Sequence, residues 1–186
     1  GARNDTVDGK GAATMMPRTH DQLLLPVNPW FMWASLLVAL LLNLLPLGRA
    51  PVVPDILALA LVFWTVHQPR RVGVGISFLF GLVMDVHAGA LLGQHALAYT
   101  LLSFFAIALH RRLLWFTAPA QALHVLPLFM AGTLVGLLVR LAAGDAFPGW
   151  SIFAAPLLQT LLWAPVSLLL LAPQRRAPDR DANRPL

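Results

Sequence analysis

The sequence has no cysteine and very little charge. None of its 186 residues is cysteine, and only 11% are Asp, Glu, Lys or Arg. The absence of cysteine excludes both a disulfide framework and a thiolate metal site. Hydrophobic residues make up 58% of the chain. A soluble domain of this size could not bury that much apolar side chain, because small domains keep a large surface. The composition therefore predicts a membrane protein, with its apolar side chains facing lipid.

The basic residues are few and are placed between apolar runs. The net charge of +5 could suggest nucleic acid. However, the Lys and Arg residues stand in short clusters at the ends of the runs, and such clusters set the topology of membrane proteins. We therefore expect the lipid bilayer, and no nucleic acid, as a partner.

Six apolar runs predict an all-α bundle of six transmembrane helices, since a helix needs about 20 mostly apolar residues to cross the hydrocarbon core. The runs are residues 30–47, 55–67, 72–87, 93–109, 120–143 and 150–171. The third and fourth are almost continuous, and one helix over both would be about 57 Å long, too long for a bilayer. The chain must turn back between them, and Gly89 and Gly93 mark the position of that turn.

The distribution of Lys and Arg predicts that both termini are cytoplasmic. With the N-terminus inside, all of the 13 basic residues except Arg49 and Arg140 fall on the cytoplasmic side, as the positive-inside rule requires. The transmembrane domain is expected at residues 30–172, after an N-terminal tail at 1–29. Residues 1–14 are expected to be a cloning remnant or an over-extended start. The polar tail at 173–186 is expected to be disordered.

Two of the predicted helices carry small residues four positions apart. The third has Gly73, Ser77, Gly81, Asp85 and Gly89, and the fifth has Gly132, Gly136, Arg140 and Gly144. Residues four apart share one helix face, and small residues let a neighbouring helix approach closely. Asp85 and Arg140 would lie at similar depth, which predicts an ion pair across a contact between these two helices. The alternative is two independent packing faces, with both charges reaching the outer water.

The other polar residues have simpler interpretations. Asp55, which follows Pro54, is expected to cap the start of the second helix, or else to anchor a partner or the outer turn. Asp145 is expected to be solvated. His87 and His95 flank the turn near Asp85, but their spacing matches no metal-ligand motif, and histidines at an interface are common. No nucleophile elbow, zinc-protease motif or phosphate loop is present. We therefore expect neither an enzyme nor a cofactor.

One region also carries a family likeness. Its elements are Pro54-Asp55, Trp64, Pro69, Arg71, Gly75, Phe80-Gly81-Leu82, Asp85, Gly89, Gly93, Ala96-Leu97 and Tyr99. With these residues, the second to fourth predicted helices resemble the family of the rod shape-determining protein MreD. The length and the six-helix layout agree with this family. The extended N-terminal start does not agree with the family. The resemblance also does not account for the row of Gly132, Gly136, Arg140 and Gly144 in the fifth predicted helix.

The resemblance implies a non-enzymatic scaffold in the bacterial inner membrane. Such proteins bind MreC, and through it they connect to the cytoskeletal filament protein MreB, the glycosyltransferase RodA and a penicillin-binding transpeptidase. The layout is also similar to the substrate-binding subunits of energy-coupling-factor vitamin transporters, although fold alone does not carry function. The alternative function is therefore a binding subunit of a small-molecule uptake system, for which polar residues on the outer side would form the pocket.

Overall fold

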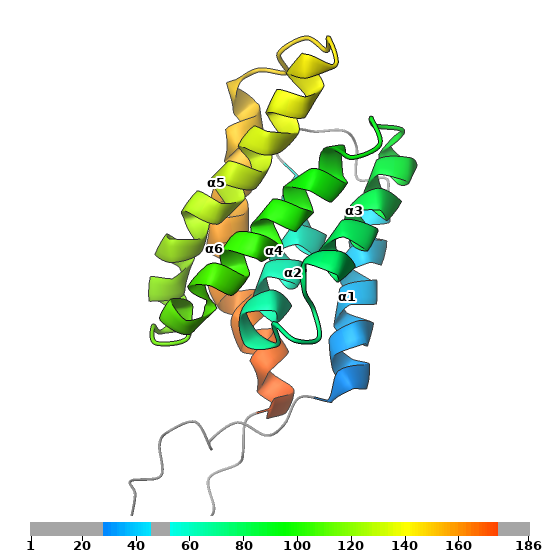
Figure 1. The fold of residues 1–186 in the computed structure, drawn as a ribbon. Coiled ribbons are helices and arrows are strands. Elements are labelled where there is room, and N and C mark those ends of the chain that lie inside the picture. Colours follow the sequence, from blue (N-terminus) through cyan, green and yellow to red (C-terminus); the bar gives the residue numbers. More distant parts are fainter. Residues whose placement is uncertain (1–27, 46–52, 175–186) are drawn as a thin grey trace, which may run out of the picture. The chain divides into compact units, whose positions relative to one another are not determined.

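The computed structural model describes residues 28–45 and 53–174, and every described regular element is helical. Figure 1 shows the bundle. The helices are α1 (Pro29–Leu44), α2 (Ile56–His67), α3 (Val74–Ala88), α4 (Gln94–Leu113), α5 (Ala118–Ala142) and α6 (Ala154–Leu171). Short 3-10 turns, η2 (Trp150–Phe153) and η3 (Ala172–Gln174), flank α6. The all-helical class and the six helices are confirmed. The predictions for Arg49 and for nearly all of both tails lie outside the described residues.

The helix ends lie close to the predicted ones, with one clear extension. The fourth helix was expected to end at residue 109, but α4 continues through Arg111 and Arg112 to Leu113. The two arginines ended the apolar run in the sequence, yet cations are favourable in the last turn of a helix, where the backbone carbonyls carry partial negative charge. Hydropathy alone therefore placed the end of this helix one turn too early.

The short helix α2 forms the centre of the bundle. Its residues from Leu57 to Val66 are all buried, and it packs against α1, α4 and α6. A helix that is apolar on every side is a buried helix. Its 12 residues span about 18 Å, less than the roughly 30 Å hydrocarbon core. The surrounding helices shield it, so its length does not have to match the bilayer.

The outward faces of the longer helices are strongly apolar. Two segments, Ala118–Ala142 and Trp150–Gln174, are long and apolar enough to cross a membrane, and only 28% of each tested window is buried. Leu123, Leu161 and Leu169 are each at least 70% exposed. Contiguous apolar surface of this kind is rare on proteins that face water. The helices are thus those expected of a membrane protein, while the orientation in the bilayer stays a prediction.

The order of packing differs from the one predicted. Helix α3 packs on α4, α4 packs on α5, and α5 packs on α6. Figure 1 shows α4 between α3 and α5. The predicted close contact between the third and fifth helices is therefore wrong. The short turn after α3 returns the chain directly alongside it, and α4 takes the place that the prediction had given to the fifth helix.

Candidate functional site: the polar network at the α3–α4 turn

Two glycines shape the turn between α3 and α4. Gly89 has a φ of 59° and Gly93 a φ of 108°, and both values lie in the left-handed region that residues with a side chain rarely adopt. A Cβ atom at either position would meet no other atom within 4 Å. Backbone conformation, and not space, is therefore the reason for glycine at these positions. The predicted turn is confirmed.

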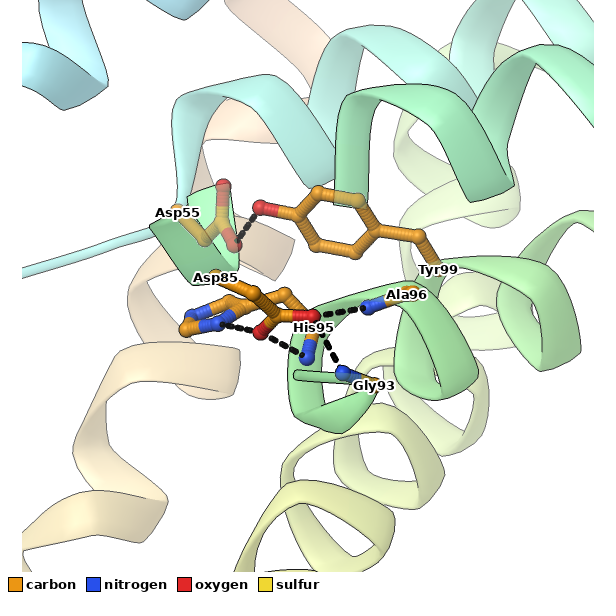
Figure 2. A network of polar contacts seen from close by, with 6 residues as sticks. All are labelled: Asp55, Asp85, Gly93, His95, Ala96 and Tyr99. Atoms are coloured by element: carbon orange, nitrogen blue, oxygen red, sulfur yellow. Dashed lines mark hydrogen bonds and ion pairs between the residues drawn. The ribbon is translucent and has the colours of Figure 1, made fainter. Parts of the chain in front are cut away.

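Asp85 is buried at the end of α3 and bonds to the start of α4. Its carboxylate accepts backbone hydrogen bonds from Gly93 N (2.8 Å), His95 N (2.7 Å) and Ala96 N (3.3 Å). The His95 Nδ1 atom lies 2.9 Å from Asp85 Oδ1. Figure 2 shows the carboxylate surrounded by these groups. The first N–H groups of a helix have no partner within it, and a carboxylate satisfies them while favouring the helix dipole. Asp85 thus caps α4 from the neighbouring helix.

The small-residue face of α3 lies against α4. A Cβ atom built on Gly81 would lie 2.4 Å from Ala96 Cα, which is too close for two non-bonded carbon atoms. One turn away, the hydroxyls of Ser77 and Ser103 are hydrogen-bonded, and Thr65 of α2 lies 3.5 Å from Ser103. The predicted close approach is confirmed for α3, with a different partner helix. At the start of α3, Gly73 occupies the N-cap position.

The predicted ion pair between Asp85 and Arg140 is wrong. Arg140 Nε lies 3.7 Å from Asp145 Oδ2, and these two side chains are 38% and 59% exposed. The oxygens of Asp85 are occupied by the start of α4, and α4 separates α3 from α5. On α5, a Cβ at Gly132 would come within 3.1 Å of the Leu102 side chain, whereas one at Gly136 would meet nothing closer than 3.9 Å.

Asp55 forms a second junction beside the first. Its Oδ1 accepts from Ala58 N (2.9 Å), which confirms the predicted helix cap, and also from Asn43 Nδ2 of α1 (2.6 Å). Its Oδ2 accepts from the hydroxyl of Tyr99 on α4 (2.5 Å). Gln159 of α6 donates to the backbone oxygen of Asp55 (2.9 Å). One residue at the start of α2, directly after Pro54, therefore ties together four helices.

His95 contacts one of the two carboxylates and packs beside the residue that bonds to the other. Its ring bonds to Asp85 and stands edge-on to Tyr99, with centroids 6.0 Å apart, and Tyr99 in turn donates to Asp55 (Figure 2). His87 is exposed at the end of α3. Within the described ranges, no three His, Cys, Asp or Glu side chains come close enough together to hold a metal ion.

Sequence reasoning did not assign a polar role to Asn43, Tyr99 or Gln159. Each is a hydrogen-bonding side chain in a mostly apolar helix, and such residues in membrane helices usually face protein and bond across helices. Tyr99 is also the only tyrosine in the chain. Applied to uncharged residues as well as to charged ones, the same rule would have found all three.

Comparisons with known proteins agree with one another. A family model described as rod shape-determining protein MreD matches residues 26–172. The chain is 35% identical over 149 residues to the rod shape-determining protein MreD of Haemophilus influenzae, an alignment that covers 76% of this chain and 89% of that protein. No solved structure matches the chain.

Proposed function

The chain belongs to the MreD family of rod shape-determining proteins, and we propose that it is a scaffold that binds MreC. The family consists of non-enzymatic membrane proteins of the cell-elongation machinery. In this proposal the six helices span the bacterial inner membrane with both termini in the cytoplasm. Through MreC the chain helps to couple MreB to peptidoglycan synthesis by RodA and a penicillin-binding transpeptidase. Family membership favours this role over that of an uptake subunit.

The observation that carries the proposal is the hydrogen bonding of two carboxylates, the buried Asp85 and the partly buried Asp55. Both oxygens of Asp85 and both of Asp55 accept hydrogen bonds from the chain's own groups. A general acid or base must reach a substrate proton, and these carboxylates are instead committed to holding helices together. The network fixes α1, α2, α3, α4 and α6 at one end of the bundle. A fixed arrangement of this kind suits a protein that presents helix faces to partners.

We place the MreC contact on the outward face of α3. The opposite face of this helix is in contact with α4, and the outward face is apolar, with Leu79 58% and Val86 72% exposed. Gly75, one turn before Leu79, is also exposed, and a Cβ there would meet nothing within 4 Å. A small residue among apolar ones on an open helix face lets a partner helix approach closely.

Cysteine crosslinking tests this assignment, because the chain has no native cysteine. The probes are Leu79→Cys and Val86→Cys on α3. The matched controls are Leu161→Cys and Leu169→Cys on α6, which are 73% and 70% exposed. Each variant is expressed in cells with MreC that carries single cysteines in its membrane helix. We expect adducts from the α3 positions and none from α6.

Two results would count against the proposal. Equal adducts from α3 and α6, or adducts from α6 alone, would show that the outward face of α3 is not the specific contact site for MreC. If the uncrosslinked, full-length chain also fails to co-purify with MreC from membranes, the scaffold role itself is wrong. Because co-purification needs no introduced cysteine, the role and the choice of face are tested separately.

A further inference from the structure

A polar cavity lies between four helices at the end of the bundle that holds the network. Its volume is about 240 Å³, and residues of α2, α4, α5 and α6 line it. Polar side chains reach it from each of these helices. They include Asp55 at the start of α2, Gln94, Thr133, Arg140 and Gln159, and His95 and Tyr99 of the network also line the cavity. An apolar bundle has no structural need to gather so many hydrogen-bonding groups around an open space.

The cavity owes its space to the glycine face of α5. Gly132 and Gly136 both line it. A Cβ at Gly136 would touch only the Gln94 side-chain nitrogen, at 3.9 Å, so no helix backbone fills the position that a side chain would take. Gly136 thus leaves open space beside α5 and does not mediate a close contact between α5 and another helix.

Three hydrogen-bond donors surround this open position. Thr133 and Arg140 stand one turn before and one turn after Gly136 on the same face of α5, and the Gln94 amide faces it from α4. Among residues 28–45 and 53–174, the Arg140 guanidinium has only the long contact to the exposed Asp145. Within the described part of the chain, neither Thr133 nor Gln94 makes a side-chain hydrogen bond. Together, the Arg140 guanidinium, the Gln94 amide and the Thr133 hydroxyl offer more hydrogen-bond donors than one carboxylate needs. They match the several acceptor oxygens of a phosphate.

Gln159 of α6 also lines the cavity and offers an acceptor. Gln159 is 4% exposed, and its Nε2 atom donates to the backbone oxygen of Asp55. Its Oε1 atom accepts no hydrogen bond from any described residue. Because Gln159 lines the cavity, this oxygen can accept a hydrogen bond from a molecule bound there. The Asp55 carboxylate already holds Asn43, Ala58 and Tyr99, which leaves Arg140 available to an anion.

We propose that this cavity binds a phosphate ester whose alcohol part carries a hydroxyl group. The phosphate lies against Arg140, Gln94 and Thr133, and the hydroxyl donates to Gln159. A phosphoglycerol group has this chemistry, and it can come from a lipid headgroup or from a soluble ester. The site is separate from the outward face of α3, so binding of the ester does not depend on MreC.

The test uses the full chain and two variants that alter the cavity in different ways. Gly136→Leu fills it, and Arg140→Gln removes its cation. Arg112→Gln, an exposed arginine at the far end of α4, is the matched control. The proteins are purified from nanodiscs that contain phosphatidylglycerol and phosphatidylcholine, and retained lipid is counted by native mass spectrometry. In a lipid-free detergent arm, thermal unfolding is followed as glycerol 3-phosphate is added.

We expect the wild-type chain and Arg112→Gln to retain one phosphatidylglycerol. Both cavity variants should lose it by about tenfold or more, the factor that corresponds to losing a hydrogen bond to a charged group. Stabilisation by glycerol 3-phosphate without lipid retention, if both cavity variants abolish it, supports the site with a soluble source. Equal retention by wild type and both cavity variants, or no response in either arm, overturns the proposal. If Gly136→Leu does not fold, Arg140→Gln alone decides between these results.

Discussion

Helices α3 and α5 both carry small residues four positions apart and a charged residue in their last turns, yet they use these residues in opposite ways. On α3 the glycine face meets a helix backbone, with no room for a Cβ atom at Gly81, and its charge is fully buried and bonded. On α5 the position of Gly136 is open, and Arg140 is partly exposed at the edge of a cavity. Small residues on a helix face therefore have two meanings, close contact or open space.

The difference arises from what stands opposite each face. The turn at Gly89 and Gly93 returns the chain directly onto α3, so α4 approaches α3 along its small-residue face. Helix α5 faces α4 side chains such as Leu102 and Gln94, which hold the two backbones apart. The four-residue spacing of small residues is the same in both helices, so the difference comes from what packs against each face.

The largest effect is expected for Gly81→Leu. A side chain there would collide with the backbone of Ala96, which cannot move without separating α3 from α4. The free energy of unfolding should fall by more than about 3 kcal/mol, at or beyond the upper end of ordinary overpacking. Thermal unfolding of the purified protein in detergent measures this. Gly75→Leu is the matched control on the exposed face of α3, and an equal loss in both variants would show that the close contact is not the cause.

The next effect is that of Asp85→Ala. Removing the carboxylate leaves the first N–H groups of α4 without partners, among them the buried N–H of Ala96. We expect a loss of about 2–3 kcal/mol in unfolding free energy, as for unsatisfied buried groups. Asp145→Ala, at an exposed carboxylate, should change the value little. The charge swap Asp85→Arg with Arg140→Asp should not recover the stability lost in the single variants. A recovery of unfolding free energy would support an ion pair between Asp85 and Arg140.

A smaller loss is expected for Tyr99→Phe. This change keeps the ring against His95 and removes only the hydroxyl that donates to Asp55. A hydrogen bond to a charged group contributes about 1.5–2 kcal/mol here. Chemical unfolding in detergent should show that loss without any change in helix content. A loss no larger than that of an exposed substitution such as Leu123→Ala would mean that Asp55 does not depend on Tyr99.

The smallest effect, and the one of opposite sign, is expected for Gly136→Ala. The new methyl group meets only the end of the Gln94 side chain, and alanine restricts the unfolded chain more than glycine does. Unfolding free energy should therefore be unchanged or rise by up to about 1 kcal/mol. Gly132→Ala, which presses on Leu102 at 3.1 Å, provides the comparison within the same helix. Destabilisation by Gly136→Ala beyond that of Gly132→Ala would contradict an open cavity at this position.

The helices could be predicted from the sequence because each is one apolar run, and the turn after α3 because an apolar stretch of that length cannot fit a bilayer as one helix. The cap at Asp55 was predictable from its position after Pro54. The partner of Asp85 was not, since equal spacing in α3 and α5 suggests equal depth but says nothing of which helix lies between them. Asn43, Tyr99 and Gln159 come from three helices, and only the fold brings them to one residue.

A pair of double-mutant cycles tests the central claim most directly. One cycle combines Asp85→Ala with His95→Ala, and the other combines Asp85→Ala with Arg140→Ala, with unfolding free energy measured for every single and double variant. If Asp85 serves the start of α4, its coupling to His95 is about 1 kcal/mol or more, and its coupling to Arg140 stays within about 0.5 kcal/mol of zero. Strong coupling to Arg140 with none to His95 would contradict the structure.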